Sequence, residues 1–255
     1  MDFNQFKEKI NHKFNINLNG YKERQLKRRI DSLMQYQGYS DYASYFSTLE
    51  NDPERWAQFM DKVTINVSEF FRNPDIFKTL EEKIIPYLIE QYGSLKIWSA
   101  ACSNGAEPYS TAMLLKELSG GRHTIHATDM DDKILALAKQ GCYPANIIKN
   151  VSDTRKRKYF EEKNGQYQLN NSARDLVSFR KHDLLTGRYE GGYHLIVCRN
   201  VTIYFTREAQ MELYSKFNKS LAQGGILFIG ATENIINYHE LGFEKYLPWF
   251  YRKVK

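Results

Sequence analysis

Residues 95–109 read LKIWSAACSNGAEPY, and this stretch decides the fold. Its apolar start, Leu95 to Ala101, predicts a β-strand, and Cys102 to Gly105 predicts a tight turn. Ala106 opens a helical pattern in which Pro108 suits the first turn, because its φ is helical and its missing N–H would have no partner there. A strand, a turn and a helix in this order place backbone N–H groups and an acidic side chain where open α/β sheets bind their ligands. An ordinary β–α connection without a ligand is the alternative at this point.

The spacing of acidic residues favours a nucleoside ligand. The next strand-like run, HTIHATDM at residues 123–130, contains Asp129, which follows Gly105 by 24 positions. A carboxylate roughly 20 residues beyond such a turn can accept hydrogen bonds from both ribose hydroxyls. The turn lacks two of the three glycines of G-x-G-x-x-G, so a pyrophosphate is disfavoured and a nucleoside without phosphates stays open.

The composition indicates a globular chain of one large or two small domains. With 255 residues and 42% hydrophobic side chains, the chain can bury a substantial core. No apolar run approaches the roughly 18 residues that span a bilayer, and the polar N-terminus has no apolar signal core, so we expect a cytoplasmic protein without membrane insertion. The three cysteines have no C-x-x-C spacing and the six histidines are scattered, so we expect reduced thiols and no metal site.

Positive charge gathers in two places, residues 22–29 and 155–158, within a net charge of +6. Between residues 21 and 34 the apolar side chains form one stripe at helical spacing, which predicts an amphipathic helix. Arg24 and Arg28 lie opposite the stripe, and Lys27 and Arg29 flank it. Burying the stripe would leave a ridge of positive charge that attracts an acidic partner, while a solvated helix face is the simpler explanation of each cluster.

The chain divides into a helical first part and an alternating second part. Pro74 disfavours helix at Asn73, which places the domain boundary there and gives a helical domain over 1–73 and a second domain over 74–255. From residue 95 strands and helices alternate, which predicts a parallel sheet with crossover helices. An interruption at 143–179 contains the turn signal Asn164-Gly165 and predicts a small inserted β subdomain. The other expected elements are helices at 41–49, 53–63 (with Asp52 as N-cap), 75–92, 106–118, 131–139 and 207–221, and strands at 95–101, 123–128, 176–184, 193–201, 226–229 and within 243–251.

Several segments together resemble the chemotaxis receptor methyltransferases of the CheR family, bacterial enzymes that use S-adenosylmethionine to methylate receptor glutamates. In chain order the segments are YKERQLKRRI (21–30), TINVSEFFR (64–72), SAACSNGAEPYSTA (99–112), ATDMD (127–131), KHDLL (181–185), CRNVTIYF (198–205) and GGILFIGATE (224–233). Each is weak alone, but the ordered set is highly specific. The resemblance implies a class I S-adenosylmethionine-dependent methyltransferase: a Rossmann-like α/β sheet with an all-helical N-terminal domain and a small inserted antiparallel subdomain.

The resemblance also assigns cofactor and active-site roles, residue by residue. The implied cofactor-binding residues are Asn66, Ser68, Arg72, Glu107 (methionine amino group), Asp129 (ribose), Asp183 and Leu184 (adenine), and Arg199 and Asn200 (near the sulfur). Two residues are expected to be catalytic: Arg72 would pair with a carboxylate of the cofactor or the substrate, and Tyr204 would orient the reacting oxygen. Core packing within the apolar IYF run is the alternative for Tyr204.

Two departures from the family pattern concern the site. Ser68 stands where the family usually has threonine and retains the hydroxyl. Asn104 and Ala106 replace two positions of the more common loop C-S-T-G-E-E-P, so we assign neither a side-chain role.

The implied partner is the cytoplasmic helical region of chemotaxis receptors. A basic helix that carries Arg24, Lys27, Arg28 and Arg29 would steer and dock an acidic coiled coil. Some members recognise a receptor's C-terminal peptide through a glycine-containing loop in the inserted subdomain. The short connection 161–167 lacks such a loop, so we do not expect tethering of that kind. We expect a monomer that binds S-adenosylmethionine, releases S-adenosylhomocysteine and uses no metal.

The expected chemistry needs no general base. A glutamate with an unperturbed pKa of about 4.3 is already anionic at neutral pH, and a sulfonium is already a good electrophile. The site must instead supply an in-line approach at roughly 3 Å in a partly dehydrated pocket.

Three other functions stay open on the sequence. A nucleic-acid methyltransferase would share the fold and the net positive charge. However, the strand that ends at Arg199-Asn200 carries no D/N-P-P-Y/F signature, and aromatic residues are not interleaved with the basic residues of the helix. We therefore expect no nucleic-acid partner. A non-catalytic sensor of S-adenosylmethionine would use the same loop, and only turnover separates it from an enzyme. A nicotinamide dehydrogenase is disfavoured by the missing glycines.

Overall fold

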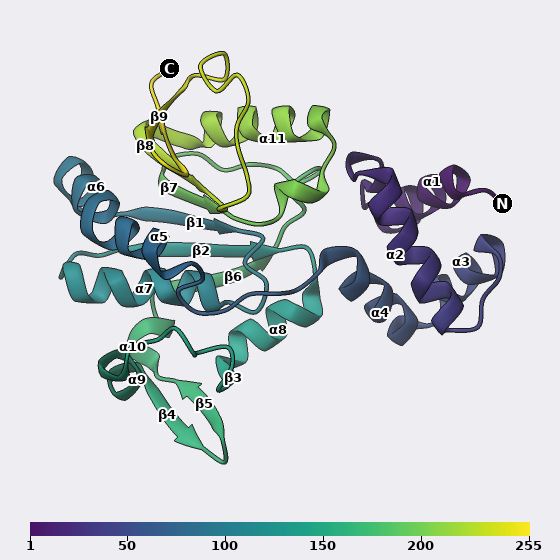
Figure 1. Ribbon diagram of the computed structural model, residues 1–255, viewed down its shortest axis with the longest axis horizontal. Coiled ribbons are helices and arrows are strands. Elements are labelled where there is room, and N and C mark those ends of the chain that lie inside the picture. Colours follow the sequence, from purple (N-terminus) through teal and green to yellow (C-terminus); the bar gives the residue numbers. More distant parts are fainter.

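The computed structural model describes residues 1–255 and has three parts (Figure 1). The largest part is a twisted sheet with helices on both faces. A bundle of helices from the first 64 residues lies beside it, and a small antiparallel sheet projects from one side. The expected division into a helical domain, an α/β domain and a small inserted sheet is therefore confirmed.

The helical domain consists of α1 (Phe3–Phe14), η1 (Leu18–Gly20), α2 (Glu23–Tyr36), α3 (Tyr42–Asn51) and α4 (Pro53–Thr64). Aspartate side chains cap three of these helices: those of Asp2, Asp41 and Asp52 accept backbone N–H groups of the first turns of α1, α3 and α4. The helix predicted from residue 21 begins two residues later, because residues 20–22 pair with the α/β domain instead.

The main sheet has seven strands in the order β6-β2-β1-β7-β8-β10-β9. Five run parallel to one another: β1 (Lys96–Ala100), β2 (Thr124–Asp129), β6 (Val177–Lys181), β7 (Tyr193–Cys198) and β8 (Leu221–Ile229). The predicted aromatic strand pair is β9 (Phe243–Leu247) and β10 (Phe250–Lys253), which add an antiparallel edge. The crossover helices are α7 (Ala106–Leu118), α8 (Asp132–Gln140) and α11 (Arg207–Ser220), and η3 (Thr202–Tyr204) is a short turn after β7.

The inserted sheet is smaller than the interval predicted for it. It pairs β3 (Cys142–Pro144), β5 (Gln166–Leu169) and β4 (Phe160–Lys163), with α9 (Asp153–Tyr159) and α10 (Asn171–Arg174) beside it. Residues 177–179 of the expected interval lie in β6 and belong to the main sheet. The Asn164-Gly165 turn is confirmed, and both residues have positive φ, 53° and 73°, as a two-residue hairpin of right-handed twist requires.

Two predicted elements differ from the structure. The helix expected at 75–92 is divided into α5 (Pro74–Thr79), a π-helical turn η2 (Leu80–Ile84) and α6 (Ile85–Tyr92). The strand expected from Ile226 begins at Leu221, so the predicted Gly224-Gly225 turn is an irregularity inside β8. The register there shifts against β7 between the pairs Tyr193–Leu221 and Leu195–Ile226.

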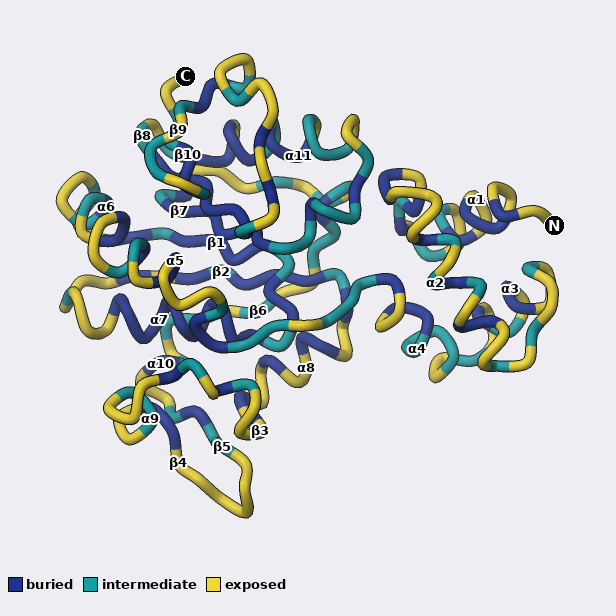
Figure 2. Tube along the Cα trace, viewed as in Figure 1, coloured by how far each residue is buried: buried dark blue, intermediate teal, exposed yellow.

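Successive side chains of the central strands point to opposite faces of the sheet and pack into two separate cores. Ile97, Leu195 and Val197 face one core, which contains side chains of α5, α6 and α7. Trp98 and Ile196 face the other, which contains side chains of α11 and continues without a break into the helical domain. Figure 2 shows the buried strands between these layers and the exposed tip of the β4–β5 hairpin.

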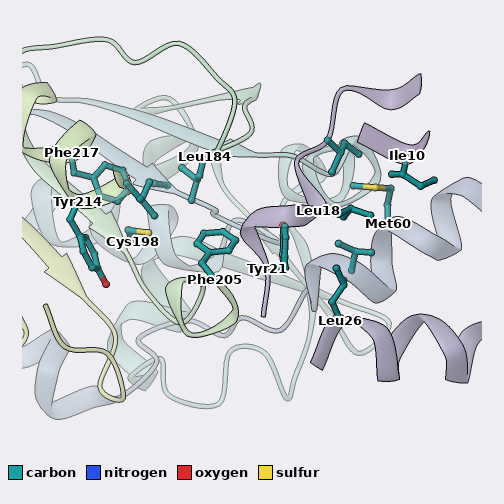
Figure 3. Packing of buried hydrophobic residues seen from close by; sticks show 14 of the residues in the cluster. Ile10, Leu18, Tyr21, Leu26, Met60, Leu184, Cys198, Phe205, Tyr214 and Phe217 are labelled. Atoms are coloured by element: carbon teal, nitrogen blue, oxygen red, sulfur yellow. The ribbon is translucent and has the colours of Figure 1, made fainter. Parts of the chain in front are cut away.

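The second core joins the helical domain to the sheet. Tyr21 and Phe205 pack edge to face with ring centroids 5.0 Å apart, and Figure 3 shows them between the helical side chains and those of the sheet. The backbone adds hydrogen bonds from Lys22 N–H to Tyr204 O (2.8 Å) and from Thr206 N–H to Gly20 O (2.8 Å). The helical domain is therefore packed directly against the turn that follows β7.

Candidate functional site

A cavity lies where β1, β2, β6 and β7 end, and it encloses about 820 Å³, including the part that is open to solvent. Its walls come from the turns after these four strands, from residues 63–68 and Arg72 in the connection between the domains, and from Tyr21 of the helical domain. The ten cofactor and catalytic positions predicted from sequence all line it: Asn66, Ser68, Arg72, Glu107, Asp129, Asp183, Leu184, Arg199, Asn200 and Tyr204.

The turn after β1 is built from residues in the left-handed region. Ala101, Ser103 and Gly105 have φ of 60°, 50° and 83°. At Gly105 space is tight as well, because a Cβ would lie 3.0 Å from that of Ala138. The resulting turn points the Ser103 N–H at Asp129 Oδ2, 2.8 Å away. The turn that contains Gly105 is thus in contact with Asp129, although the contact is made by Ser103.

Asp129 is a buried carboxylate at the end of β2. It accepts N–H groups from Ser103 and, at 3.1 Å, from Asp131. Burial raises the pKa of its carboxyl from 3.8 to about 6, and these two N–H groups oppose the increase. At neutral pH the carboxylate is therefore charged and can accept further hydrogen bonds from the cavity.

Glu107 and Arg199 form a buried ion pair that also lines the cavity. Arg199 Nη1 lies 3.4 Å from Glu107 Oε2, and Ser99 Oγ donates to Glu107 Oε1 at 3.0 Å. Arg199 Nη2 also donates to Arg72 O (2.9 Å) and to Asn73 Oδ1 (3.0 Å). Burial raises the pKa of Glu107, and the positive charge of Arg199 opposes that change. The pair fixes both side chains and joins the connection between the domains to β7.

Arg72 has a guanidinium without an acidic partner. Its Nη1 donates to Val67 O at 3.1 Å, and it forms no ion pair. Asn66 Nδ2 donates to Asp131 Oδ2 at 2.8 Å, which ties the same connection to the start of α8. Ser68 contributes its carbonyl, which accepts from Asn104 Nδ2 at 3.1 Å. Arg72 is therefore the cation of the cavity wall that remains available to a carboxylate.

Asn104 has a side-chain role that the sequence did not predict. Its Nδ2 binds Ser68 O, and its Oδ1 accepts the Ala106 N–H at 3.1 Å. The side chain thus links the turn after β1 to the connection between the domains. The sequence assigns no role to this side chain, because the link depends on a contact with a residue 36 positions away in the chain.

Tyr204 lies beside Arg29 of the basic helix. The Arg29 guanidinium carbon is 5.2 Å from the Tyr204 ring centroid, and Arg29 Nη1 donates to Val63 O at 3.0 Å. Arg29 is therefore half-buried against the site rather than part of an outward ridge. Tyr204 itself is partly exposed and lines the cavity, so its side chain is not confined to core packing.

Among the other basic side chains of the two clusters, some form ion pairs and some do not. Arg24 and Arg28 are exposed and form no ion pair, whereas Lys27 binds Asp31 at 2.6 Å. In the second cluster Arg155 lies between Glu81 and Glu117, at 2.6 and 2.7 Å. Free positive charge on α2 is therefore concentrated at Arg24 and Arg28.

Three further residues complete the site without having been predicted. Tyr21 lines the cavity from the helical domain, His182 lines it beside Asp183, and Glu233 lies behind the turn after β7. The segments YKERQLKRRI, KHDLL and GGILFIGATE contain them, so their motifs were visible. Their position at the site depends on contacts between distant segments, which spacing alone does not reveal.

Polar atoms without partners show that the cavity fits a polar ligand. Eight buried side-chain atoms in the molecule lack a hydrogen-bond partner, and four belong to residues that line this cavity: Ser103 Oγ, His182 Nε2, Arg199 Nε and Asn200 Oδ1. Buried polar groups are normally satisfied. Donors, acceptors and two carboxylates in one cavity fit a nucleoside that carries an amino-acid tail. No group of three or more His, Cys, Asp or Glu side chains is arranged to hold a metal ion, and no helix is long and apolar enough to cross a bilayer.

Comparison with known proteins gives the same division of the chain. Residues 1–64 match the model of the CheR methyltransferase all-alpha domain, and residues 66–246 match that of the CheR methyltransferase SAM binding domain. A chemotaxis protein methyltransferase of Listeria monocytogenes is 41% identical over 255 residues, covering 99% of this chain and 97% of the relative. That of Borreliella burgdorferi is 32% identical and covers 94% of this chain and 89% of the relative. That of Escherichia coli is 33% identical and covers 83% of this chain and 75% of the relative. With a cavity that fits an adenosyl amino acid and matches to both domain models, this chain belongs to the CheR family of S-adenosylmethionine-dependent methyltransferases.

Proposed function

We propose that this protein transfers the methyl group of S-adenosylmethionine to side-chain carboxylates of glutamate residues in chemotaxis receptors, forming methyl esters for sensory adaptation. The observation that carries the proposal is Arg72, a guanidinium without an ion pair in the wall of the cofactor cavity. A cation left unpaired beside two buried carboxylates is suited to an incoming carboxylate. The relatives named chemotaxis protein methyltransferase support the same class of substrate.

Each end of the cavity would hold one part of the cofactor. Glu107 would accept hydrogen bonds from the amino group of the methionine portion, and the buried Arg199 keeps it oriented. Asp129 would accept the ribose hydroxyls, and Asp183 and Leu184 would contact the adenine. When bound, S-adenosylmethionine supplies a methyl group on a positively charged sulfur, which a carboxylate can attack directly. The sulfur would then lie near Asn200 and Tyr204.

The residues of the chain would contribute position and dehydration rather than acid–base chemistry. A glutamate carboxylate is already ionised at neutral pH, so no base is required. Arg72 would pair with the carboxylate, and the Tyr204 hydroxyl would orient the reacting oxygen toward the methyl group. The surrounding walls, among them Tyr21 and Phe205, would exclude water and strengthen both interactions.

The basic helix α2 would dock the substrate. Arg24 and Arg28 are exposed and unpaired, and they lie on the helix that also presents Arg29 to Tyr204. An acidic receptor helix placed along α2 would therefore have its glutamates close to the site, with electrostatic attraction that weakens as salt increases.

Methyl transfer to a purified receptor cytoplasmic fragment tests the proposal. The protein is incubated with the fragment and S-adenosylmethionine labelled on its methyl group, and the product is treated with mild base. We expect label that mild base releases and that maps to glutamate. Absence of transfer, with the labelled cofactor bound, would favour the non-catalytic sensor. Label on nucleic acid, with binding that falls steeply as salt rises, would favour a nucleic-acid methyltransferase.

A further inference from the structure

Glu233 is a buried carboxylate that forms no ion pair. It follows β8 and accepts five hydrogen bonds. Oε2 accepts the N–H groups of Gly230 (2.6 Å) and Asn200 (2.9 Å), and Oε1 accepts the N–H groups of Val201 (3.1 Å) and Thr202 (2.8 Å) and the Thr202 hydroxyl (2.7 Å). Four of the five donors come from residues 200–202, the turn between β7 and η3. One carboxylate thus holds almost the whole backbone of that turn.

The arrangement requires close approach of two segments. At Gly230 a Cβ would lie 2.7 Å from Glu233 Oε2 and 2.8 Å from the Asn200 nitrogen, so only glycine fits. Asn200 itself has φ of 60°, in the left-handed region that asparagine tolerates and most residues avoid. Hydrogen bonds to a charged acceptor are stronger than neutral ones, and they hold this uncommon conformation in place.

The turn that Glu233 holds carries residues that face the cavity. Asn200 lines the cavity, and its Oδ1 is buried without a hydrogen-bond partner in the protein. Tyr204 follows in η3 and also lines the cavity. Glu233 does not line the cavity, so the contact by which it can influence a ligand is the one with this turn.

We propose that Glu233 is a positioning residue for methyl transfer: its carboxylate fixes the turn 200–202, so that Asn200 Oδ1 faces the cofactor and Tyr204 faces the reacting carboxylate. The cofactor part rests on the S-adenosylmethionine site alone. The part that concerns Tyr204 rests on the proposed function.

Calorimetric titration with S-adenosylhomocysteine tests the cofactor part without any receptor. Glu233→Gln replaces one acceptor oxygen by an NH₂ group, which must face at least two of the five donors, at least one of them in the turn. We expect the dissociation constant to rise about tenfold, the loss that follows from one hydrogen bond to a charged group. Glu244→Gln is the matched control, because Glu244 pairs with Arg252 between β9 and β10, away from the cavity. This variant should bind S-adenosylhomocysteine with the affinity of the wild type.

A double-mutant cycle separates positioning from general loosening. If Glu233 acts through Asn200, Glu233→Gln should have little further effect on affinity in the Asn200→Ala background. The cofactor part is wrong if the effects of the two substitutions on the dissociation constant are independent, so that the double variant shows their product. It is also wrong if Glu233→Gln alone leaves the dissociation constant within about twofold of the wild-type value.

A milder pair of variants covers the case in which Glu233→Gln does not fold. Thr202→Val removes one donor to Oε1 and keeps the carboxylate, whereas Thr202→Ser keeps the hydroxyl. The valine variant should bind S-adenosylhomocysteine about threefold more weakly, and the serine variant should bind as the wild type does. Equal affinity of the two variants would contradict the proposal.

Turnover with the receptor fragment then tests the part that concerns Tyr204. At saturating cofactor and receptor, kcat of Glu233→Gln should fall about tenfold or more, and much less in the Tyr204→Phe background. An unchanged kcat would restrict Glu233 to the cofactor. A wild-type protein that binds S-adenosylhomocysteine but does not methylate the receptor would refute the proposed function and the Tyr204 part, and the calorimetric cycle would still decide the cofactor part.

Discussion

At the scale of single residues, Asp129 gives the site a pH dependence. Its carboxyl has a pKa of about 6 rather than 3.8 because it is buried. Only the ionised form can accept both ribose hydroxyls, so a proton competes with the ligand below this pH. We expect the affinity for S-adenosylhomocysteine to be constant above about pH 7 and about tenfold weaker near pH 5, one unit below the pKa. Calorimetric titration across this range measures the effect.

The control for the Asp129 prediction is Asp129→Asn. The amide cannot titrate, so this variant should bind more weakly at every pH and lose the slope between pH 5 and 7. A slope that persists in the variant would assign the pH dependence to another group.

Arg72 is the residue that would recognise the substrate carboxylate in the proposed function. Arg72→Ala removes the guanidinium that would pair with the reacting carboxylate, and we expect kcat/KM for receptor methylation to fall about 100-fold. Arg72→Lys should restore little, because a lysine cannot offer two parallel N–H groups to one carboxylate. Steady-state methylation assays measure both. Near-normal turnover of a folded Arg72→Ala protein would remove Arg72 from the mechanism.

How far the site could be predicted differs from residue to residue. Glu107 and Asp129 were found because a strand, a turn and a helix impose fixed offsets on the residues at the ends of parallel strands. Glu233 and Tyr21 carry no such offset: each reaches the site through contacts with a segment far away in the chain. Local patterns predict the chemistry of strand ends, but not the side chains that tertiary packing brings behind or above them.

At the scale of elements, the arginines of α2 lie in two different environments. Arg24 and Arg28 are exposed, while Arg29 contacts Tyr204 and Val63 O. We expect Arg24→Glu with Arg28→Glu to raise the KM for receptor about tenfold or more at low salt and to leave S-adenosylhomocysteine affinity unchanged. Arg29→Glu should lower kcat as well, because it places a carboxylate beside Tyr204.

Methylation assays at several salt concentrations check the α2 prediction. Arg157→Glu is the matched control, since Arg157 is exposed on α9, forms no ion pair and lies far from the cavity. Equal effects of the α2 and α9 reversals would indicate a general loss of attraction instead of docking along α2.

Most elements were predicted from periodicity, and the exceptions have local physical causes. The helix expected at 75–92 is interrupted before Pro86, which has no N–H to donate. The chain accommodates this with the π-helical turn η2, closed by a hydrogen bond from Ile85 N–H to Leu80 O. The predicted end of the inserted subdomain was wrong because β6 of the main sheet follows it closely. The sequence pattern of a strand does not show to which of the two sheets the strand belongs.

At the scale of the whole molecule, the two domains share one core. The sequence indicated a helical domain and an α/β domain, but not that residues 20–22 of the first pair with residues 204–206 of the second. The buried cluster that begins with Phe3 runs through Tyr21 and Phe205 to Trp98 without a break. The proposed docking helix α2 and Tyr204 therefore belong to one packed unit.

A shared core predicts that both domains unfold in a single cooperative transition. In a Trp56→Phe background the remaining tryptophans, Trp98 and Trp249, report on the α/β domain, and far-ultraviolet circular dichroism reports on helices of both domains. Urea unfolding followed by these two signals should give coincident curves. Phe205→Ala, which removes a 2% exposed ring from the contact with Tyr21, should lower the free energy of unfolding by about 3–5 kcal/mol and shift both curves together. Two separated transitions in the Trp56→Phe protein would mean that the helical domain folds independently, and a shift of only one curve in the Phe205→Ala variant would mean that the contact stabilises one domain alone.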